Sequence, residues 1–362
     1  MLLINDSEVR QTLKMAECIE AAERAFAEEA RGIAVNRPRV RYKVPPDLTQ
    51  PGYMANIIAG AVPSSGVAAL RYDSSIVQER VVGGAKRMDF PSPSKRSWGF
   101  VLLFSLATGE PLALIHDFSL SAIRVGATTG VAHRALSKKD AKTVGIFGSG
   151  NEARRNLEAI CLVRGIDHVK VYSPNREHRE KFAAEMTEAL DVEVQPVASP
   201  EAVIRGVDIV MSATNSSEPV FDGNWLEPGQ LVTTLVNTDG VHRRTEGDAA
   251  TMIRSDFIVL NNKETAVQNQ QRELLDLIDD GKIGWDKVCE LGQVLTGKHP
   301  GRTGDRQLIY YKSNTGVGIQ FAAAGALVYE ACKKQGLGRE LPTEWFGADL
   351  SEWMDKGYLP SP

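Results

Sequence analysis

The chain has 362 residues, 43% hydrophobic and 24% charged, which is the composition of an ordinary globular protein of about two domains. Its net charge of −4 gives no reason to expect binding to nucleic acid or to an anionic membrane. Met1 is not followed by a basic and then an apolar stretch, and no apolar run approaches the ~18 residues of a membrane span, so we expect neither a signal peptide nor a membrane helix. The four cysteines and six histidines are scattered, which argues against a metal site and favours a reduced, cytoplasmic compartment.

The first 120 residues predict an α+β unit. Residues 5–31 carry apolar side chains at helical spacing and predict one helix, ended by Gly32. Residues 66–72 have the pattern of a buried strand, and a polar surface loop is expected from 75 to 96. Two apolar runs in 99–117, separated by a Thr-Gly-Glu turn, predict a β-hairpin.

Residues 36–46 predict a strand with one basic face. Its apolar residues alternate with three cations, Arg39, Arg41 and Lys43. Three cations on one face are unfavourable unless water solvates them or an anion faces them. The pattern therefore leaves two interpretations, a solvated edge strand whose charge blocks aggregation and a strand that binds an anion.

Residues 119–136 predict a closely packed helix because they are rich in Ala and Gly. Ser119 or Ser121 is expected to cap it. Arg124 would lie near its start, where the helix N–H groups already favour an anion. Arg124 is therefore either an anion-binding residue or an exposed surface arginine.

The pattern in 141–176 is the most informative. Residues 143–147 form a buried strand pattern, GSGNEA follows at 148–153, and a helix and a second strand, 168–172, come next. Gly148 permits a tight turn, Gly150 lets the backbone approach a pyrophosphate, and Ala153 lets the helix pack on the strand. The N–H groups of the helix then face the phosphates. This βαβ context favours a dinucleotide site over a glycine turn without a ligand.

The end of the second strand bears on which dinucleotide is bound. An NAD site usually places Asp or Glu there to hold the ribose hydroxyls. This chain has Ser173, Asn175 and Arg176 instead, and these side chains can bind a 2′-phosphate. We therefore favour NADP(H) over NAD(H), with a solvated turn as the alternative.

The alternating pattern of strands and helices continues to residue 336. Strands are predicted at 192–197, 208–213, 231–236, 257–260 and 308–311, with a charged helical region at 262–288 and a long apolar helix that returns to the first unit. Asp239 follows a strand, at the edge where a ligand crevice would lie. Asp before Gly is also a common turn.

The chain resembles the ornithine cyclodeaminase/μ-crystallin family over about residues 10–335. The resemblance rests on SAIRVGATTGVA, GIFGSGNEA, VNTDG, LGQVLTGKHPGR and YKSNTGVGIQ, which occur in the family's order. It implies an α/β protein in which a Rossmann dinucleotide-binding domain, 121–317, is inserted in an α+β open-sheet domain, 1–120 plus 318–362. The outer domain would bind substrate and form a homodimer.

The resemblance also implies roles for individual residues. Arg41 and Arg124 would bind the substrate carboxylate, with Arg39 a second match for Arg41, and Asp239 would handle the substrate nitrogen. The implied cofactor-binding residues are Gly148, Ser149, Gly150, Asn151, Glu152, Ala153, Ser173, Asn175, Arg176, Ala213, Thr214, Asn215, Val236, Asn237, Asn314 and Gly316.

The chain departs from the family pattern at the substrate site. Arg71 stands where the family has a lysine near the reacting carbon, so it would bind carboxylate and occupy a catalytic position, although arginine does not release a proton near neutral pH. Asn314 stands in place of Ser, Phe321 often in place of Asp, and Tyr53-Met54-Ala55-Asn56 in place of an MPAY-like segment. These changes predict an altered substrate.

Three functions follow from the resemblance. The first is an NAD(P)H-dependent oxidoreductase that moves hydride to or from the α-carbon of a small amino acid or its imine. Because three arginines exceed what one carboxylate needs, we expect a substrate with a second acidic group. The second is a cyclodeaminase that releases ammonia from a diamino acid and uses the cofactor catalytically. The third is a cofactor-binding protein without activity.

Overall fold

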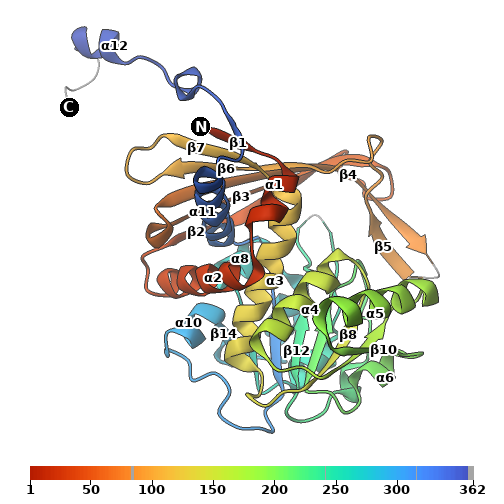
Figure 1. Ribbon diagram of the computed structural model, residues 1–362. Coiled ribbons are helices and arrows are strands. Elements are labelled where there is room, and N and C mark those ends of the chain that lie inside the picture. Colours follow the sequence, from red (N-terminus) through yellow and green to blue (C-terminus); the bar gives the residue numbers. More distant parts are fainter. Residues whose placement is uncertain (83–84, 241, 315, 358–362) are drawn as a thin grey trace.

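The computed structural model describes residues 1–82, 85–240, 242–314 and 316–357. Two sheets organise these residues, one above the other in Figure 1. The first sheet comes from the N-terminal part of the chain with one late strand, β16, and the second sheet comes from the middle part.

The first sheet is mostly antiparallel. Its strand order is β16-β1-β7-β6-β4-β3-β2, and β5 pairs with the far end of β4. The strands are β1 (Leu2–Ile4), β2 (Val35–Val44), β3 (Gly52–Val62), β4 (Val67–Val82), β5 (Ala85–Asp89), β6 (Trp98–Ser105), β7 (Pro111–His116) and β16 (Arg339–Glu340).

Four helices cover one face of the first sheet (Figure 1). They are α1 (Asp6–Thr12), α2 (Met15–Ala30), α3 (Asp117–Leu136) and α11 (Gly318–Gln335). Buried side chains of β6, α2 and α11, among them Leu103, Phe26 and Phe321, form one core there. α11 begins so close to β3 that a Cβ on Gly318 would lie 1.9 Å from the carbonyl oxygen of Ala59, so only glycine fits. The last long helix of the chain thus completes the first core.

The second sheet is parallel throughout, in the order β10-β9-β8-β11-β12-β15-β13-β14. Its strands are β8 (Thr143–Phe147), β9 (His168–Tyr172), β10 (Glu193–Pro196), β11 (Ile209–Ser212), β12 (Leu231–Thr234), β13 (Phe257–Leu260), β14 (Val288–Glu290) and β15 (Ile309–Lys312). The helices are α4 (Asn151–Val163), α5 (Arg176–Leu190), α6 (Pro200–Ile204), α7 (Ala249–Arg254), α8 (Lys263–Gln268), α9 (Arg272–Asp279) and α10 (Leu291–Leu295). Its central strands β11, β12 and β13 are buried along their whole length and are mostly apolar, as is typical of a sheet covered on both faces.

This arrangement confirms the predicted fold class, a Rossmann sheet inserted in an open-sheet α+β unit. The chain leaves the first sheet through α3 and returns to it through α11. The predicted domain division falls inside α3 and directly ahead of α11.

Several predicted elements need correction. The helix predicted for 5–31 is two helices, because Leu13 is extended and buries its side chain at the bend between α1 and α2. The loop predicted for 75–96 is largely strand, because β4 continues to Val82 and pairs antiparallel with β5. The helical region predicted for 262–288 is two short helices followed by β14, which begins at its last residue. His116, and not a serine, caps α3.

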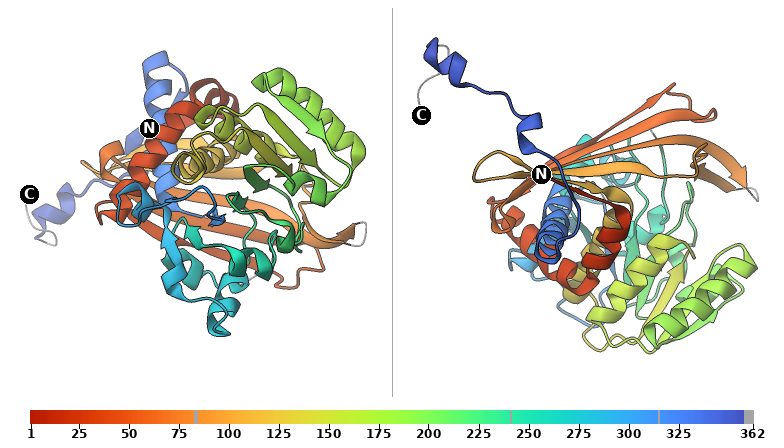
Figure 2. Two further views of the ribbon diagram at one scale, coloured as in Figure 1. Left: turned by 90° about the horizontal axis from the view of Figure 1, so that it is seen from below. Right: turned by 45° about the horizontal axis from the view of Figure 1, so that its top comes forward.

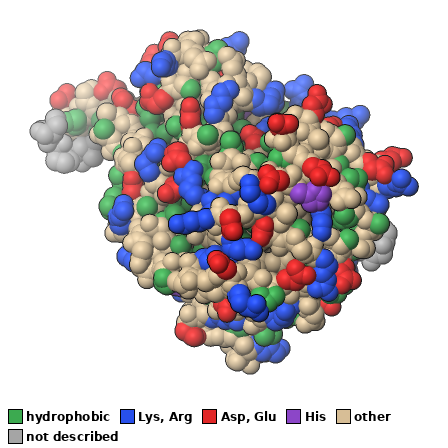
Figure 3. All heavy atoms as spheres, turned by 60° about the horizontal axis from the view of Figure 1, so that its bottom comes forward, with side chains coloured by type: hydrophobic (Ala, Val, Ile, Leu, Met, Phe, Trp, Pro, Cys, Tyr) green, Lys and Arg blue, Asp and Glu red, His purple; other side chains and the backbone are tan. Residues whose placement is uncertain are grey.

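The C-terminal segment extends away from the body (Figures 1 and 2). It follows β16 and contains the helix α12 (Ser351–Asp355). Trp345 and Trp353 on it are 73% and 56% exposed. On the face seen in Figure 3, basic and acidic side chains are interspersed. None of the helices in the described part of the chain is both long and apolar enough to cross a membrane.

Candidate active site

A cavity of about 320 Å³ lies where the two sheets meet. Its walls come from β2, β3, β4, α3 and α4, and from the segments that follow β11 and β12. It brings together predicted substrate residues and predicted cofactor residues that lie far apart in the sequence. They are Arg41, Arg71, Arg124, Glu152, Ala213, Thr214, Val236, Asn237 and Gly316.

The basic face of β2 turns inward, toward Asp239. Arg39 Nη2 lies 2.8 Å from Asp239 Oδ2, and Arg41 bonds the same oxygen. The apolar residues that alternate with them face outward, and Val40 and Val44 are 57% and 62% exposed. Of the two interpretations of this strand, the structure therefore supports the one in which the arginines face an anion.

Lys43, the third cation of β2, does not face Asp239. Its Nζ donates to backbone carbonyls in the turn after the strand, at 2.8 Å from Pro45 O and 3.2 Å from Gln50 O. It holds that turn closed.

The carboxylate of Asp239 binds the two arginines and a backbone N–H group. Its Oδ1 accepts a hydrogen bond from the backbone N–H of His242 at 3.0 Å, and its Oδ2 receives both arginines. Asp239 is not among the described residues that line this cavity, whereas Arg39 and Arg41 are. Burial and the neighbouring Arg41 lower the pKa of Arg39 to about 9, and Asp239 partly offsets them.

Arg71 is held by two carboxylates. Its Nε and Nη2 donate to Asp117 Oδ2 at 2.8 and 2.6 Å, and its Nη1 lies 2.9 Å from Asp73 Oδ1. Three of the five N–H groups of its guanidinium are thus engaged. These contacts raise its pKa despite burial, so Arg71 stays a cation.

Arg124 lies two turns into α3, farther from the start of the helix than the sequence suggested. Its Nη1 donates to Gln320 Oε1 at 2.6 Å and its Nη2 to Ser121 Oγ at 3.1 Å. Its guanidinium lies 4.4 Å from the ring centroid of Phe321, and that of Arg71 lies 5.4 Å from the same ring. Phe321, noted as a departure from the family, is thus the support on which both arginines rest.

Five arginines line the cavity, against two carboxylates, Asp73 and Glu152. Sequence reasoning did not single out Arg244, and the burial of this residue lowers its pKa to about 10. Within the described residues, the Nε atoms of Arg39, Arg124 and Arg244 have no hydrogen-bond partner, nor has Oε2 of Glu152. Buried polar groups are rarely left unsatisfied, so these atoms indicate a polar, predominantly anionic ligand.

The glycine turn is built as the motif predicts. Gly148 has φ +105°, and a Cβ there would lie 2.3 Å from the carbonyl oxygen of Ala213. Gly150 is the N-cap of α4 without a side-chain cap, and an added Cβ there would meet no protein atom within 4 Å. Open space beside uncapped helix N–H groups fits the pyrophosphate of a dinucleotide.

A buried carboxylate that sequence reasoning missed joins the segments after β11 and β12. Glu246 Oε1 accepts the N–H of Thr214 at 2.6 Å, and its Oε2 accepts the N–H groups of Leu235 and Val236 at 2.8 and 2.9 Å. These segments form one wall of the cavity. No local motif marked Glu246, because its partners are other segments' backbone groups.

Some predicted cofactor residues lie elsewhere. Asn314 is fully buried and bonds the backbone of Asn261 and Asn262. Asn175 caps α5, and Arg176 is 78% exposed beside Glu180. Asn215 is exposed outside the cavity, and Asn151 lines a neighbouring one.

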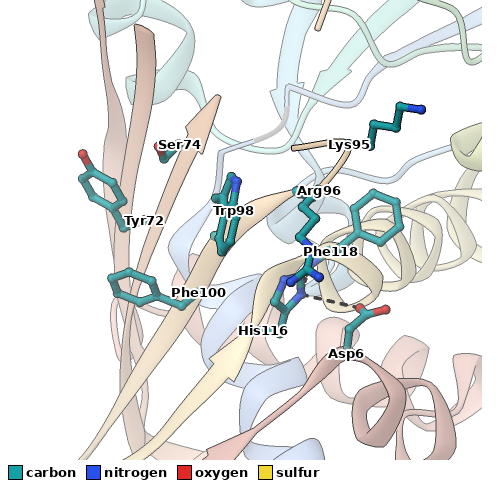
Figure 4. Close-up of a pocket in the computed structure, with 11 residues that line it drawn as sticks. Asp6, Tyr72, Ser74, Lys95, Arg96, Trp98, Phe100, His116 and Phe118 are labelled. Carbon is teal, nitrogen blue, oxygen red and sulfur yellow. Dashed lines mark hydrogen bonds and ion pairs between the residues drawn. The ribbon is translucent and has the colours of Figure 1, made fainter. Parts of the chain in front are cut away.

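Two further hollows lead from the cavity to the surface. The first, about 940 Å³, shares Arg71, Asp73 and Glu152 with it. The second, about 690 Å³, shares Trp98 and Phe118 with the first. Figure 4 shows this outer hollow, where Trp98 and Phe100 of β6 lie opposite Arg96 and Phe118. A dashed line there joins His116 to Asp6, 3.7 Å apart.

Comparison of the chain with known proteins identifies its family. The model of the ornithine cyclodeaminase/mu-crystallin family matches residues 1–336. The chain belongs to that family. A Δ¹-pyrroline-2-carboxylate reductase of Bacillus cereus is 28% identical over 94% of this chain and 99% of its own length.

Solved structures of family members agree. That of the Thermococcus litoralis Δ¹-pyrroline-2-carboxylate reductase with NADH and L-proline has a TM-score of 0.83 and 29% identity, over 94% of this chain and all of that one. That of an archaeal alanine dehydrogenase dimer with NAD has a TM-score of 0.80 and 25% identity, over 94% and 99%. The present chain is therefore an NAD(P)-dependent oxidoreductase that acts on the α-carbon of a small amino acid or its imine.

Proposed function

We propose that this enzyme reduces a small α-imino acid that carries a second acidic group, and that it prefers NADP(H). The observation that carries the proposal is the set of five arginines around one cavity, three of them with an Nε that has no hydrogen-bond partner among the described residues. One substrate carboxylate pairs with one or two guanidinium groups, so the remaining arginines need a second acidic group of the substrate to pair with.

The arginines divide between two places in the cavity. Arg71 and Arg124 share the ring of Phe321, and together they suit the α-carboxylate next to the reacting carbon. Arg71 has two N–H groups left for this contact. Arg39, Arg41 and Arg244 come from β2 and from the segment after β12, and we assign them to the second acidic group.

We assign Asp239 a positioning role as well as its proposed contact with the substrate nitrogen. It pairs with Arg39 and Arg41, so a substrate nitrogen would compete with these two arginines for its carboxylate. Asp239 therefore couples the binding of the second acidic group to the position of its own carboxylate.

The cofactor assignment rests on the glycine turn and on the residues after β9. When bound, the nicotinamide supplies or takes up the hydride. The open space at Gly150 would receive the pyrophosphate, and Ala213, Thr214, Val236 and Asn237 lie at the carboxyl ends of β11 and β12, where the nicotinamide half belongs. Ser173 and Arg176 follow β9 with no carboxylate between them, which favours a 2′-phosphate.

We further infer that the enzyme is a homodimer. The outward face of β2 leaves Val40, Tyr42 and Val44 exposed, and a second copy would bury such a row of apolar side chains. The related archaeal alanine dehydrogenase is a dimer. Light scattering of the purified protein measures its molar mass directly.

To test this proposal, the purified enzyme is mixed with NADPH or NADH and with imines formed from ammonia and 2-oxo acids. The absorbance of the reduced nicotinamide is then followed over time. We expect steady oxidation of NADPH, with a lower KM for imines that bear a second carboxylate. Release of ammonia from a diamino acid without net oxidation of NADPH would show a cyclodeaminase. Binding of NADPH without any turnover would show a protein that has lost activity.

Two adjacent arginines give a matched pair of variants. Arg244 lines the cavity, whereas Arg243 is 74% exposed and pairs with Asp276. Loss of a charged hydrogen bond costs about 1.5–3 kcal/mol. Arg244→Gln should therefore raise the KM for a dicarboxylic imine about 10- to 100-fold and leave that of a monocarboxylic imine nearly unchanged. Arg243→Gln should change neither, and an equal effect on both imines would remove Arg244 from the second subsite.

A further inference from the structure

Reduction of a C=N bond needs a proton as well as a hydride. The arginines that line the cavity do not supply one, because guanidinium groups do not deprotonate near neutral pH. The source must therefore be a carboxyl, an imidazole, a hydroxyl or water at the cavity wall.

Most carboxylates near the cavity are committed to arginines. Asp73 and Asp117 both pair with Arg71, at 2.9 and 2.6 Å, and Asp239 receives Arg39 and Arg41. Each of these pairs requires the ionised carboxylate, which has no proton to give. His242 lies behind Asp239 and is neutral, since burial and Arg244 lower its pKa to about 4.

Glu152 is the exception. It lies at the second position of α4, in the wall that the cavity shares with the larger hollow beside it. Among the residues that the structure describes, it forms no ion pair within 4.0 Å, and its Oε2 is buried without a hydrogen-bond partner. A carboxyl in this position faces the substrate space on one side and a route to solvent on the other.

We propose that Glu152 is the catalytic acid of this enzyme and gives its proton to the substrate nitrogen. This inference rests on the proposed reduction of an imine. The hydride forms the new C–H bond at the α-carbon, the π pair of the C=N bond moves to nitrogen, and nitrogen takes the proton from the Glu152 carboxyl. The carboxylate that remains regains a proton from water in the neighbouring hollow.

The electrostatics around Glu152 suit this role. Burial raises its pKa to about 7, while Arg124 on α3 and Arg155 on α4 act in the opposite direction. Arg71 and Asp73 on β4 face the same cavity as an ion pair. An acid with a pKa near the working pH is protonated often enough to donate and ionises readily enough to do so quickly.

The first experiment compares Glu152→Gln with wild type. Glutamine keeps the shape of the side chain and removes its acidic proton. We expect kcat to fall about 10²- to 10⁴-fold, with NADPH affinity changed less than threefold. In wild type, the rate should fall as pH rises above about 7, since the acid is then ionised, and Glu152→Gln should lose this dependence. Glu158→Gln, farther along α4 and paired with Arg155, is the matched control and should behave as wild type.

A second readout does not depend on activity. Burial raises the pKa of Glu29 to about 7 as well, so wild type should show two protonated carboxyl bands that titrate near pH 7. In infrared difference spectra of the protein without substrate, the Glu29 band should remain in both proteins, and the band of Glu152 should be missing in Glu152→Gln. Absence of the Glu152 band from wild type overturns the proposal even if the enzyme is active. So does a variant that keeps its kcat and pH profile, or one altered only in NADPH affinity. If wild type shows the band but reduces no imine, the proposed function has failed and Glu152 has no substrate to protonate.

Discussion

The ring of Phe321 supports two neighbouring cations, of which Arg71 also pairs with Asp117 and Asp73. The face of an aromatic ring attracts a cation and takes none of its hydrogen bonds. Arg124 and Arg71, at 4.4 and 5.4 Å from the ring, are therefore held in place while part of their hydrogen-bonding capacity stays available. An aspartate at this position would neutralise one of them, so Phe321 suits a substrate with more negative charge.

Replacing Phe321 by Leu should weaken substrate binding more than it weakens the fold. The cation–ring contacts are worth about 0.5–2 kcal/mol, so we expect the KM for the imine to rise roughly tenfold in steady-state kinetics. Phe26→Leu is the control, because Phe26 in α2 is as fully buried as Phe321, whereas Arg71 and Arg124 lie over the ring of Phe321. Both variants should lower the unfolding midpoint, and an equal rise of KM in both would show that the ring acts only through packing.

Residues that act together here are often far apart in sequence, and this limited what could be predicted. The alternation in β2 marked Arg39, Arg41 and Lys43 as one face, but it did not show which way the face points. Arg39 and Asp239 are 200 positions apart, and nothing local to either predicts their pairing. The glycine turn was visible because its strand, turn and helix are contiguous.

Glu246 and Arg244 were missed for the same reason. The partners of Glu246 are backbone N–H groups of two other segments, which have no sequence signature. Arg244 follows a conspicuous Asp-Gly pair, and only the fold brings it to the cavity wall.

At the scale of elements, His133 joins α3 to the second sheet. Its Nε2 lies 2.9 Å from Thr233 Oγ1 on β12, and it is fully buried. Burial and Arg164 lower its pKa to about 3, against about 6.5 in an unfolded chain. Between these values the unfolded chain binds a proton that the folded chain does not, so stability falls as pH falls below about 6.5.

The free energy of unfolding should therefore depend on His133. Its contribution is lost at about 1.4 kcal/mol per pH unit below pH 6.5, or about 2 kcal/mol by pH 5. In urea unfolding at pH 7 and pH 5, His133→Gln should show a smaller loss between the two pH values than wild type, by about that amount. His178→Gln, on the exposed side of α5, should keep the wild-type loss. A slope unchanged in His133→Gln would contradict this account.

The elements predicted least well were those that long-range pairing defines. The second half of β4 carries Ser74, Ser75, Gln78, Glu79 and Arg80, a composition typical of a loop. It is strand because β3 and β5 pair with it. The opposite holds for the central strands of the second sheet, whose apolar composition alone predicts burial.

At the scale of the whole molecule, the first core depends on residues near the end of the chain. α11 packs on β3, β4 and α2 and supplies Phe321 and a row of buried alanines to the core. The arm beyond residue 343 leaves the body, as Figure 2 shows. The two parts of the C-terminal region thus differ in what they contribute to stability.

Two truncations separate these contributions. A chain of residues 1–343 keeps α11 and should unfold at nearly the wild-type urea concentration. A chain of residues 1–317 loses α11 and exposes the part of the first core that α11 covers on β3 and β4, so it should bind a hydrophobic dye and unfold without a sharp transition. Unfolding of residues 1–317 at the wild-type midpoint would show that α11 is dispensable.

The return of α11 to the first sheet also has a consequence for synthesis on the ribosome. β1 to β7 emerge first, together with α1 and α2, yet the part of their apolar face that α11 covers stays exposed until more than 200 further residues have been translated, up to Gln335. The strands of the second sheet are consecutive in the chain, so that sheet can close as soon as β15 has emerged. The core that begins to form first is therefore completed last. A nascent chain stalled between β7 and α11 would expose apolar surface to which chaperones can bind.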